Sequence, residues 1–207
     1  MPAPFAPTVF IVDDDEAVRK AVSRLLRSAG FAVTVFGSAG EFLAQYDPAT
    51  PGCLVLDITM PEVDGLQLQA TLSQKDSMLP IIFLTGHGDV SKSVQAMKRG
   101  AFDFLSKPVK DKDLLTAVRA AIERDAIARR KQAQLSAIRD RLDLLTTRER
   151  EVLEHVVSGK LNKQIAGDLG ITEATVKMHR AHVMEKMGVQ SVAELARLTE
   201  RYGVKLA

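Results

Sequence analysis

The sequence predicts two domains: an α/β domain with a doubly wound, five-stranded parallel sheet, and an all-α domain of four helices. Short apolar runs alternate with amphipathic segments in the first part of the chain, which is typical of βαβ units with helices on both faces of a sheet. Four capped helical segments occupy the last part. We place the α/β domain at 6–125, a helical linker at 126–142 and the all-α domain at 143–207.

The α/β domain is expected to contain five strands, of which 8–12 and 53–57 are predicted to be buried because their apolar runs are short and largely without polar interruption. These strands are predicted at 8–12, 32–36, 53–57, 80–85 and 102–106. Amphipathic helices separate them, and a last helix starts near Asp111. Right-handed crossovers restrict the topology, and we expect a flavodoxin-like strand order.

Polar side chains stand where four of these strands end. They are Asp13 and Asp14, Asp57, Thr85 and Lys107. The carboxyl ends of parallel strands meet at one edge of the sheet, where ligands bind in open α/β folds. Any one of these residues alone could be a turn or cap residue. The set of four strand ends favours a functional site.

Three of these residues are acids, and clustered carboxylates repel one another unless a cation compensates them. Mg²⁺, or another small divalent cation such as Mn²⁺, prefers such oxygen ligands. We predict that Asp13, Asp14 and Asp57 bind the ion, with the backbone carbonyl of Thr59 as a further ligand. Asp15 is expected in the first turn of the next helix, where an acid suits the helix dipole.

The other two side chains suit a phosphoryl group. Lys107 offers a positive charge to one phosphate oxygen and Thr85 offers a hydroxyl to another. Asp57 could then act as a carboxylate nucleophile on phosphorus and form an aspartyl phosphate.

Composition narrows the environment of the chain. There is no apolar run long enough to span a membrane, and the N-terminus lacks the features of a signal peptide. The single cysteine, Cys53, lies in a predicted strand, so we expect a reducing, cytoplasmic setting. The net charge is −3 over residues 1–125 and +5 over 126–207, which suggests that the C-terminal part meets a polyanion.

The linker region contains no Gly or Pro between residues 111 and 145 and is predicted to be helical. It carries two apolar stripes that are one residue out of register. They consist of Leu115, Val118 and Ile122, and of Leu135, Ile138, Leu142 and Leu145. A continuous coiled coil is therefore not supported. We expect a long helix, and the sequence leaves open whether it is continuous or broken near residue 130. Both a dimer contact and a plain spacer also remain open.

Helix caps divide the C-terminal domain. Thr146 and Glu149 fit a capping box, Asn162 is expected to cap the second helix, and Thr172 the third. A second capping box begins at Ser191. Two helices joined by a short Gly-containing turn form the helix-turn-helix pattern.

The third of these helices, 173–187, is the predicted recognition helix. Val176, His179, Val183 and Met187 share a face that should pack inward. The residues expected to reach DNA are Lys163, Thr175, Lys177, Met178, Arg180, Ala181 and His182. His179 and His182 could be called a metal pair, but the sequence offers no neighbouring carboxylate or cysteine to complete a coordination set.

These motifs resemble those of known families. Ile11–Asp15, Asp57–Pro61, Thr85–Gly86 and Lys107–Pro108 are similar to the receiver domain of two-component response regulators. Leu145–Leu153, Asn162–Ala166 and Thr175–His179 resemble the LuxR-type DNA-binding domain. Together they resemble response regulators of the FixJ/NarL class.

The resemblance implies a sensor histidine kinase that phosphorylates Asp57 with Mg²⁺ bound. It implies that Thr85 then moves toward the phosphoryl group, that Phe104 turns inward, and that Lys107–Pro108 is a cis peptide. We therefore expect a bacterial transcription factor that is not an enzyme beyond its own phosphotransfer and dephosphorylation. It would form homodimers on phosphorylation or on promoter DNA.

The sequence allows two other functions. The α/β domain could be a phosphorylation-independent interaction module with constitutive DNA binding, but the complete set of acids, Thr85 and Lys107 argues against it. A phosphatase-type enzyme using an aspartyl phosphate would leave the DNA-binding half without a role.

Overall fold

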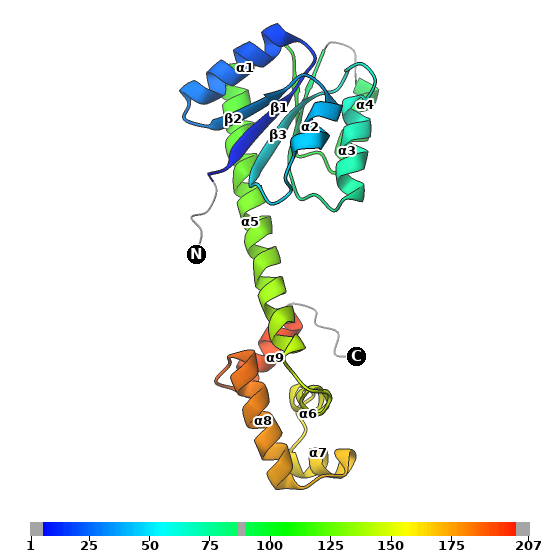
Figure 1. Ribbon diagram of the computed structural model, residues 1–207, viewed down its shortest axis with the longest axis vertical. Helices are drawn as coiled ribbons and strands as arrows, with labels where there is room; N and C mark the ends of the chain where they lie inside the picture. Colours follow the sequence, from blue (N-terminus) through cyan, green and yellow to red (C-terminus); the bar gives the residue numbers. More distant parts are fainter. Residues whose placement is uncertain (1–5, 87–89, 202–207) are drawn as a thin grey trace. The chain divides into compact units, whose positions relative to one another are not determined.

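The computed structural model describes residues 6–86 and 90–201, and the chain divides into two compact units, 1–130 and 131–207. The N-terminal unit is built on a five-stranded parallel sheet (Figure 1). The strands are β1 (Thr8–Val12), β2 (Ala32–Phe36), β3 (Gly52–Asp57), β4 (Ile81–Thr85) and β5 (Asp103–Ser106). Their order, β2-β1-β3-β4-β5, confirms the predicted flavodoxin-like topology.

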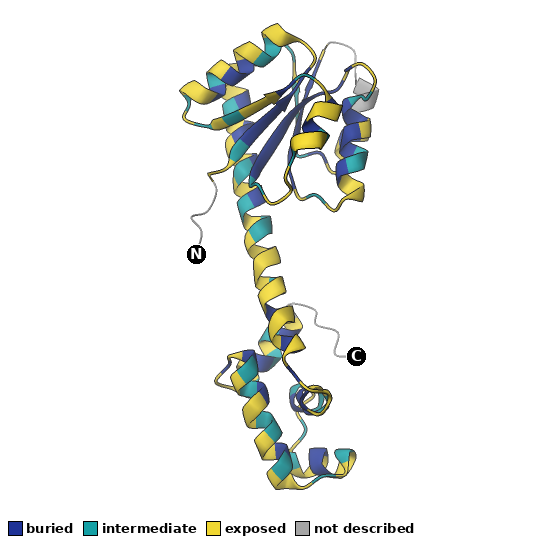
Figure 2. Ribbon diagram, in the orientation of Figure 1, coloured by how far each residue is buried: buried dark blue, intermediate teal, exposed yellow. Residues whose placement is uncertain are grey.

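Helices cover both faces of this sheet. They are α1 (Glu16–Ser28), α2 (Ala39–Gln45), α3 (Gly65–Gln74), α4 (Val90–Lys98) and the first part of α5 (Asp111–Asp143). Alternate residues of a strand point to opposite faces. Accordingly, Ile11 and Val55 pack with residues of α1 and α5, whereas Leu54 and Leu56 pack with residues of α2 and α3. The central strands β1, β3 and β4 are therefore almost wholly buried (Figure 2).

One buried ion pair fixes α5 to the rest of the N-terminal unit. Asp125, 1% exposed, accepts hydrogen bonds from Arg129 Nε at 2.8 Å and from the Gly52 amide at 2.9 Å. The Arg129 guanidinium also donates to the carbonyls of Pro48, Ala49 and Thr50. Asp125 lies one turn before Arg129 on α5, whereas the three carbonyls lie in the chain just before β3. This arginine therefore joins α5 to the start of β3.

The structure answers the question that the sequence left open for α5. The helix is continuous from Asp111 to Asp143, with no break near residue 130. Its inward stripe on the sheet consists of Leu114, Ala117, Val118 and Ala121, and shares only Val118 with the stripe found in the sequence. Leu115 and Ile122 are only partly buried beside it. The second stripe packs in the other unit, through Ile138 and Leu142, so one helix can serve two cores without a shared register.

The C-terminal unit contains the end of α5 and four further helices within the described residues. These are α6 (Thr147–Val157), α7 (Asn162–Leu169), α8 (Glu173–Met187) and α9 (Val192–Arg201). Their apolar faces form one core, which includes Val152, Ile165, Val176 and Leu195. No helix among the described residues is long and apolar enough to cross a membrane.

Most of the predicted caps are present. Thr146 and Glu149 form the reciprocal capping box of α6, and Thr172 Oγ1 accepts from the Thr175 amide at the start of α8. The prediction for Asn162 is wrong, because the residue before α7 is Leu161 and Asn162 is already helical. The amide of Leu161 donates to Gln164 Oε1 instead, so a glutamine caps this end from inside the helix.

Candidate phosphoacceptor pocket and DNA-binding helix

The four strand ends singled out in the sequence meet at one edge of the sheet. Asp57 is the last residue of β3 and Thr85 the last of β4, while Asp13 and Lys107 follow β1 and β5 directly. Backbone hydrogen bonds hold the loops in place, from Ile58 N to Leu84 O and from Lys107 N to Thr85 O. The peptide between Lys107 and Pro108 is cis, as the resemblance implied.

Three carboxylates converge there. Asp13, Asp14 and Asp57 each place an oxygen within 4.8 Å of the others. Asp13 and Asp57 are buried, at 0% and 6% exposed, and Asp14 is exposed. The third acid of the run is engaged elsewhere, because Asp15 caps α1 by accepting from the amides of Ala17 and Val18. The arrangement leaves Asp13 and Asp14 as the acids beside Asp57.

Lys107 joins two of these carboxylates. Its Nζ lies 2.7 Å from Asp13 Oδ2 and 2.8 Å from Asp57 Oδ1. Burial lowers the pKa of Lys107, but its bonds to Asp13 and Asp57 outweigh this and raise the pKa above its ordinary value. The ammonium group is thus charged and held at the pocket by two buried acids.

The pocket remains short of positive charge. Burial raises the pKa of Asp57, Lys107 opposes that rise, and the neighbouring Asp13 and Asp14 add to it. The three carboxylates carry more negative charge than the one ammonium group of Lys107 can balance. Their oxygens therefore suit a small, hard divalent cation as ligands. The residues present therefore fit Mg²⁺.

The remaining predicted pocket residues lie close by along the chain. Thr85 is buried and its Oγ1 donates to Gly86 O at 3.1 Å. Thr59 is exposed in the loop after β3. Phe104 on β5 is half-buried and packs against the core on the α2, α3 and α4 face of the sheet. It also lines a surface cavity of about 210 Å³ with residues of the loop before α5.

Helix α8 separates into an inner and an outer face. Val176, Val183 and Met187 are buried, as predicted. Lys177, Met178 and Ala181 are exposed, and so is Lys163 on α7. Thr175 is half-buried, and its hydroxyl lies 2.9 Å from that of Thr172. The exposed set is small or basic, which suits contact with DNA.

Two residues predicted to reach phosphates instead contact protein side chains. Arg180 donates to Asn162 Oδ1 at 2.7 Å, which ties α8 to the start of α7. His182 Nδ1 lies 3.5 Å from Glu149 Oε1. Half-buried His179 stands beside them, so the sequence argument that no carboxylate accompanies the two histidines is wrong. The capping box located Glu149 on α6, but only the packing of α6 on α8 brings it to the histidines.

Comparison with known protein families matches both units. The family model described as "Response regulator receiver domain" covers residues 9–119, more than half of the chain. The model described as "Bacterial regulatory proteins, luxR family" covers residues 143–199. The chain belongs to the response regulators. It combines a receiver domain with a LuxR-type DNA-binding domain, and neither matched family model is that of an enzyme.

Relatives of known function resemble this response regulator over almost its whole length. Nodulation protein W of Bradyrhizobium diazoefficiens is 45% identical over 95% of the chain and 86% of the relative. The transcriptional regulatory protein FixJ of Azorhizobium caulinodans is 45% identical over 95% and 93%. Phosphorylation-dependent control of transcription is the standard mode of this family, and it is the function of this chain.

Solved structures agree with the fold. The structure of the response regulator StyR matches with a TM-score of 0.89 and 45% identity. The match covers 95% of this chain and 100% of the StyR chain. Full-length FixJ from B. japonicum matches with a TM-score of 0.58 and 40% identity over 96% and 98% of the two chains.

Proposed function

We propose that Asp57 is the residue phosphorylated in this response regulator, by transfer from a phosphohistidine of a sensor histidine kinase. The observation that carries the proposal is the convergence of Asp13, Asp14 and Asp57 within 4.8 Å, with Lys107 Nζ 2.8 Å from Asp57. Asp13, Asp14, Asp57 and the carbonyl of Thr59 would hold Mg²⁺, which would screen the acids from the incoming phosphate.

The transfer requires Asp57 to be ionised. One carboxylate oxygen attacks phosphorus while the bond between phosphorus and the histidine nitrogen breaks, and that nitrogen keeps the electron pair. Lys107, already beside Asp57, would accompany the phosphate oxygens as negative charge moves onto the new acyl phosphate. Hydrolysis of that acyl phosphate in the same pocket would return Asp57 to its carboxylate form.

The conformational switch would begin at Thr85. Its hydroxyl donates to the Gly86 carbonyl at 3.1 Å. A phosphoryl group on Asp57 offers charged oxygens, which are stronger acceptors, at the end of the neighbouring strand. Movement of Thr85 would open space for half-buried Phe104 to turn inward, and the face formed by α4, β5 and α5 would then form a homodimer.

The C-terminal domain would read promoter DNA through α8. Lys177, Met178 and Ala181 would enter the major groove, while Lys163, Thr175, Arg180 and His182 would lie near the phosphates. To contact phosphates, Arg180 must break its hydrogen bond to Asn162 or keep it while a second donor group binds the phosphate. His182 must likewise leave Glu149 or contact both groups. Paired domains would bind two half-sites about one helical turn apart.

A mass measurement tests the phosphoacceptor. Wild-type protein with Mg²⁺ and a small phosphodonor, or with the cognate kinase, should gain one phosphoryl group and shift toward dimer in size-exclusion chromatography. Asp57→Asn should gain none, because the amide is a poor nucleophile. Asp76→Asn is the matched control, since Asp76 is exposed and its positive φ of 52° suits asparagine. Persistent labelling of Asp57→Asn would overturn the assignment.

The recognition helix is tested separately. Lys177→Ala should weaken promoter binding about tenfold and, if the lysine contacts a base, relax sequence preference at one position. Unchanged affinity and preference would argue against α8 as the reading helix. Lys131→Ala, an exposed lysine on α5, is the control for the loss of one positive charge.

A further inference from the structure

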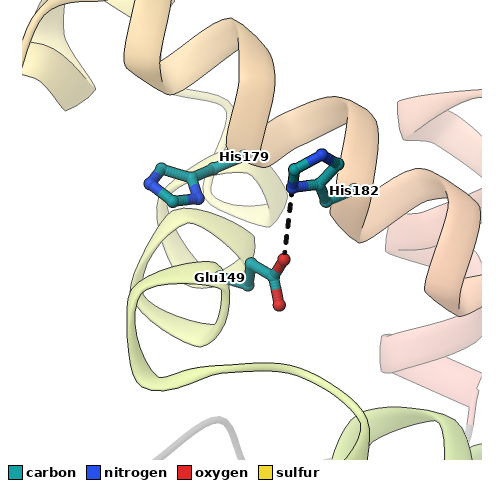
Figure 3. Close-up of side chains that lie close together, drawn as sticks. All are labelled: Glu149, His179 and His182. Carbon is teal, nitrogen blue, oxygen red and sulfur yellow. Dashed lines mark ion pairs between the residues drawn. The ribbon is translucent and has the colours of Figure 1, made fainter.

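A second cluster of metal-binding side chains lies within the LuxR-type domain. Glu149 on α6 and His179 and His182 on α8 each place one ligand atom within 4.8 Å of the others. Figure 3 shows a ring nitrogen of each histidine turned toward the Glu149 carboxylate. A carboxylate with two imidazoles is a ligand set that proteins use for zinc.

The carboxylate is fixed before any ion arrives. Glu149 is 3% exposed, and its Oε2 accepts from the Thr146 amide at 2.8 Å and from Lys186 Nζ at 2.6 Å. Its other oxygen, Oε1, is the one 3.5 Å from His182 Nδ1. The bonds to Oε2 thus orient the carboxylate so that Oε1 faces the histidines, as outer-shell partners do in metal sites.

His179 supplies an independent observation. Its Nδ1 is buried and has no hydrogen-bond partner within the described part of the chain. A buried imidazole nitrogen without a hydrogen-bond partner destabilises the fold, and in the tautomer protonated at Nε2 the Nδ1 of His179 carries a lone pair. A metal ion in the cluster would use that lone pair.

We propose that Glu149 Oε1, His179 Nδ1 and His182 Nδ1 form a binding site for a divalent transition metal of the zinc class, with water completing its coordination. Imidazole ligands favour zinc, copper and nickel over magnesium or calcium. Zinc binds these atoms at about 2.0–2.2 Å, so the ligands must draw together. His182 is the residue free to move, because its side chain is 48% exposed.

The site would join the first turn of α6 to the middle of α8. The ion would therefore stabilise the LuxR-type domain and hold His182 on Glu149, away from the phosphates it is expected to approach. The neighbouring Lys186 ammonium repels a cation, but its bond to Oε2 also holds the Glu149 carboxylate in place.

Zinc titration of the full-length protein tests the site, with excess Mg²⁺ present to occupy the receiver pocket. Calorimetry should show saturable binding of one Zn²⁺ that is weakened at least tenfold in His182→Ala. His155→Ala is the matched control, since His155 lies on α6 outside the cluster, and it should bind as wild type does. Equal binding by all three proteins would overturn the proposal, as would no saturable binding by wild type.

A second readout locates the ion. In protein labelled with ¹⁵N only at histidine, Zn²⁺ should shift the imidazole signals of His179 and His182 and leave that of His155 in place. Shifts confined to His155 would also overturn the proposal. Unchanged far-ultraviolet circular dichroism of metal-free His182→Ala would establish that the variant is folded.

Discussion

Lys107 Nζ lies 2.8 Å from Asp57 Oδ1, so the ammonium group occupies the side of the proposed nucleophile where positive charge is needed. Replacing it with glutamine leaves three acids without their internal counter-charge. We expect Lys107→Gln to bind Mg²⁺ several-fold more tightly, because the ion no longer competes with an ammonium group. Phosphorylation of Asp57 should nevertheless slow at least tenfold, since charge stabilisation of the transferred group is lost.

Calorimetric Mg²⁺ titration and the rate of mass gain with a small phosphodonor measure the two effects. Lys110→Gln, three residues along the same loop and exposed, should change neither. Weaker Mg²⁺ binding in Lys107→Gln would mean that the lysine orders the acids more than it competes with the ion.

Gly52 begins β3 at a φ of 152°, and a Cβ there would lie 1.8 Å from the carbonyl oxygen of Thr8. No side chain fits without separating β1 from β3. We expect Gly52→Ala to lower the free energy of unfolding of the receiver domain by more than about 2 kcal/mol, measured by urea denaturation. Gly40→Ala, at an exposed position of α2, should be neutral or stabilising by about 0.5 kcal/mol.

Arg129 is expected to stabilise the receiver domain although it lies on the linker helix. Arg129→Ala removes its bonds to three carbonyls and leaves Asp125 buried without its cation. A loss of about 2–4 kcal/mol in the unfolding free energy of this domain should follow. The neighbouring Arg130 is exposed, so Arg130→Ala should have an effect below about 0.5 kcal/mol. Equal effects of the two variants in urea denaturation would contradict the role given to Arg129.

Glu149 should make the stability of the LuxR-type domain depend on pH. Its bond to Lys186, opposed by burial and aided by Thr146, lowers the pKa of Glu149 from 4.5 to about 2. A lowered acid pKa stabilises the fold above the unfolded value, and this contribution is lost as pH falls from about 4.5 toward 2. Glu149→Gln should therefore lower the free energy of unfolding by about 2 kcal/mol at neutral pH. The stability of this variant should also fall less steeply than that of wild type as the pH drops below about 4.5.

Thermal unfolding between pH 2 and 7 measures this contribution. Glu151→Gln is the control, because Glu151 forms an exposed pair with Arg148 and such pairs contribute about 0–1 kcal/mol. If the stability of Glu149→Gln fell as steeply at acid pH as that of wild type, groups other than Glu149 would be responsible for the pH dependence.

The receiver fold and the convergence of its polar residues could be predicted because both depend on local rules. A buried strand that ends in Asp57 and another that ends in Thr85 must deliver these residues to the same edge once the strands are parallel. The apolar stripe found in the sequence, Leu115, Val118 and Ile122, shares only Val118 with the inward stripe of α5. Leu114 and Leu115 are both apolar, and only packing on the sheet decides between them.

Contacts between helices could not be predicted from the sequence, because they also depend on packing. Nothing local distinguishes Asn162 as a helix cap from Asn162 as the acceptor for Arg180, because the arginine belongs to another helix. Likewise, the position of Glu149 beside His182 depends on how α6 crosses α8. The sequence alone therefore predicts DNA contacts for Arg180 and His182, and does not indicate that a carboxylate lies beside His179 and His182.

The burial of Cys53 has a practical consequence. It is the single cysteine of the chain, it is 0% exposed, and burial raises the pKa of its thiol to about 12. Because the thiolate is the reactive form, this cysteine should not react with maleimide in the folded protein. Cysteines introduced at exposed positions such as Ser73 and Glu185 can therefore carry fluorophores in the natural background. Energy transfer between two such labels would follow the receiver and DNA-binding domains as phosphodonor is added.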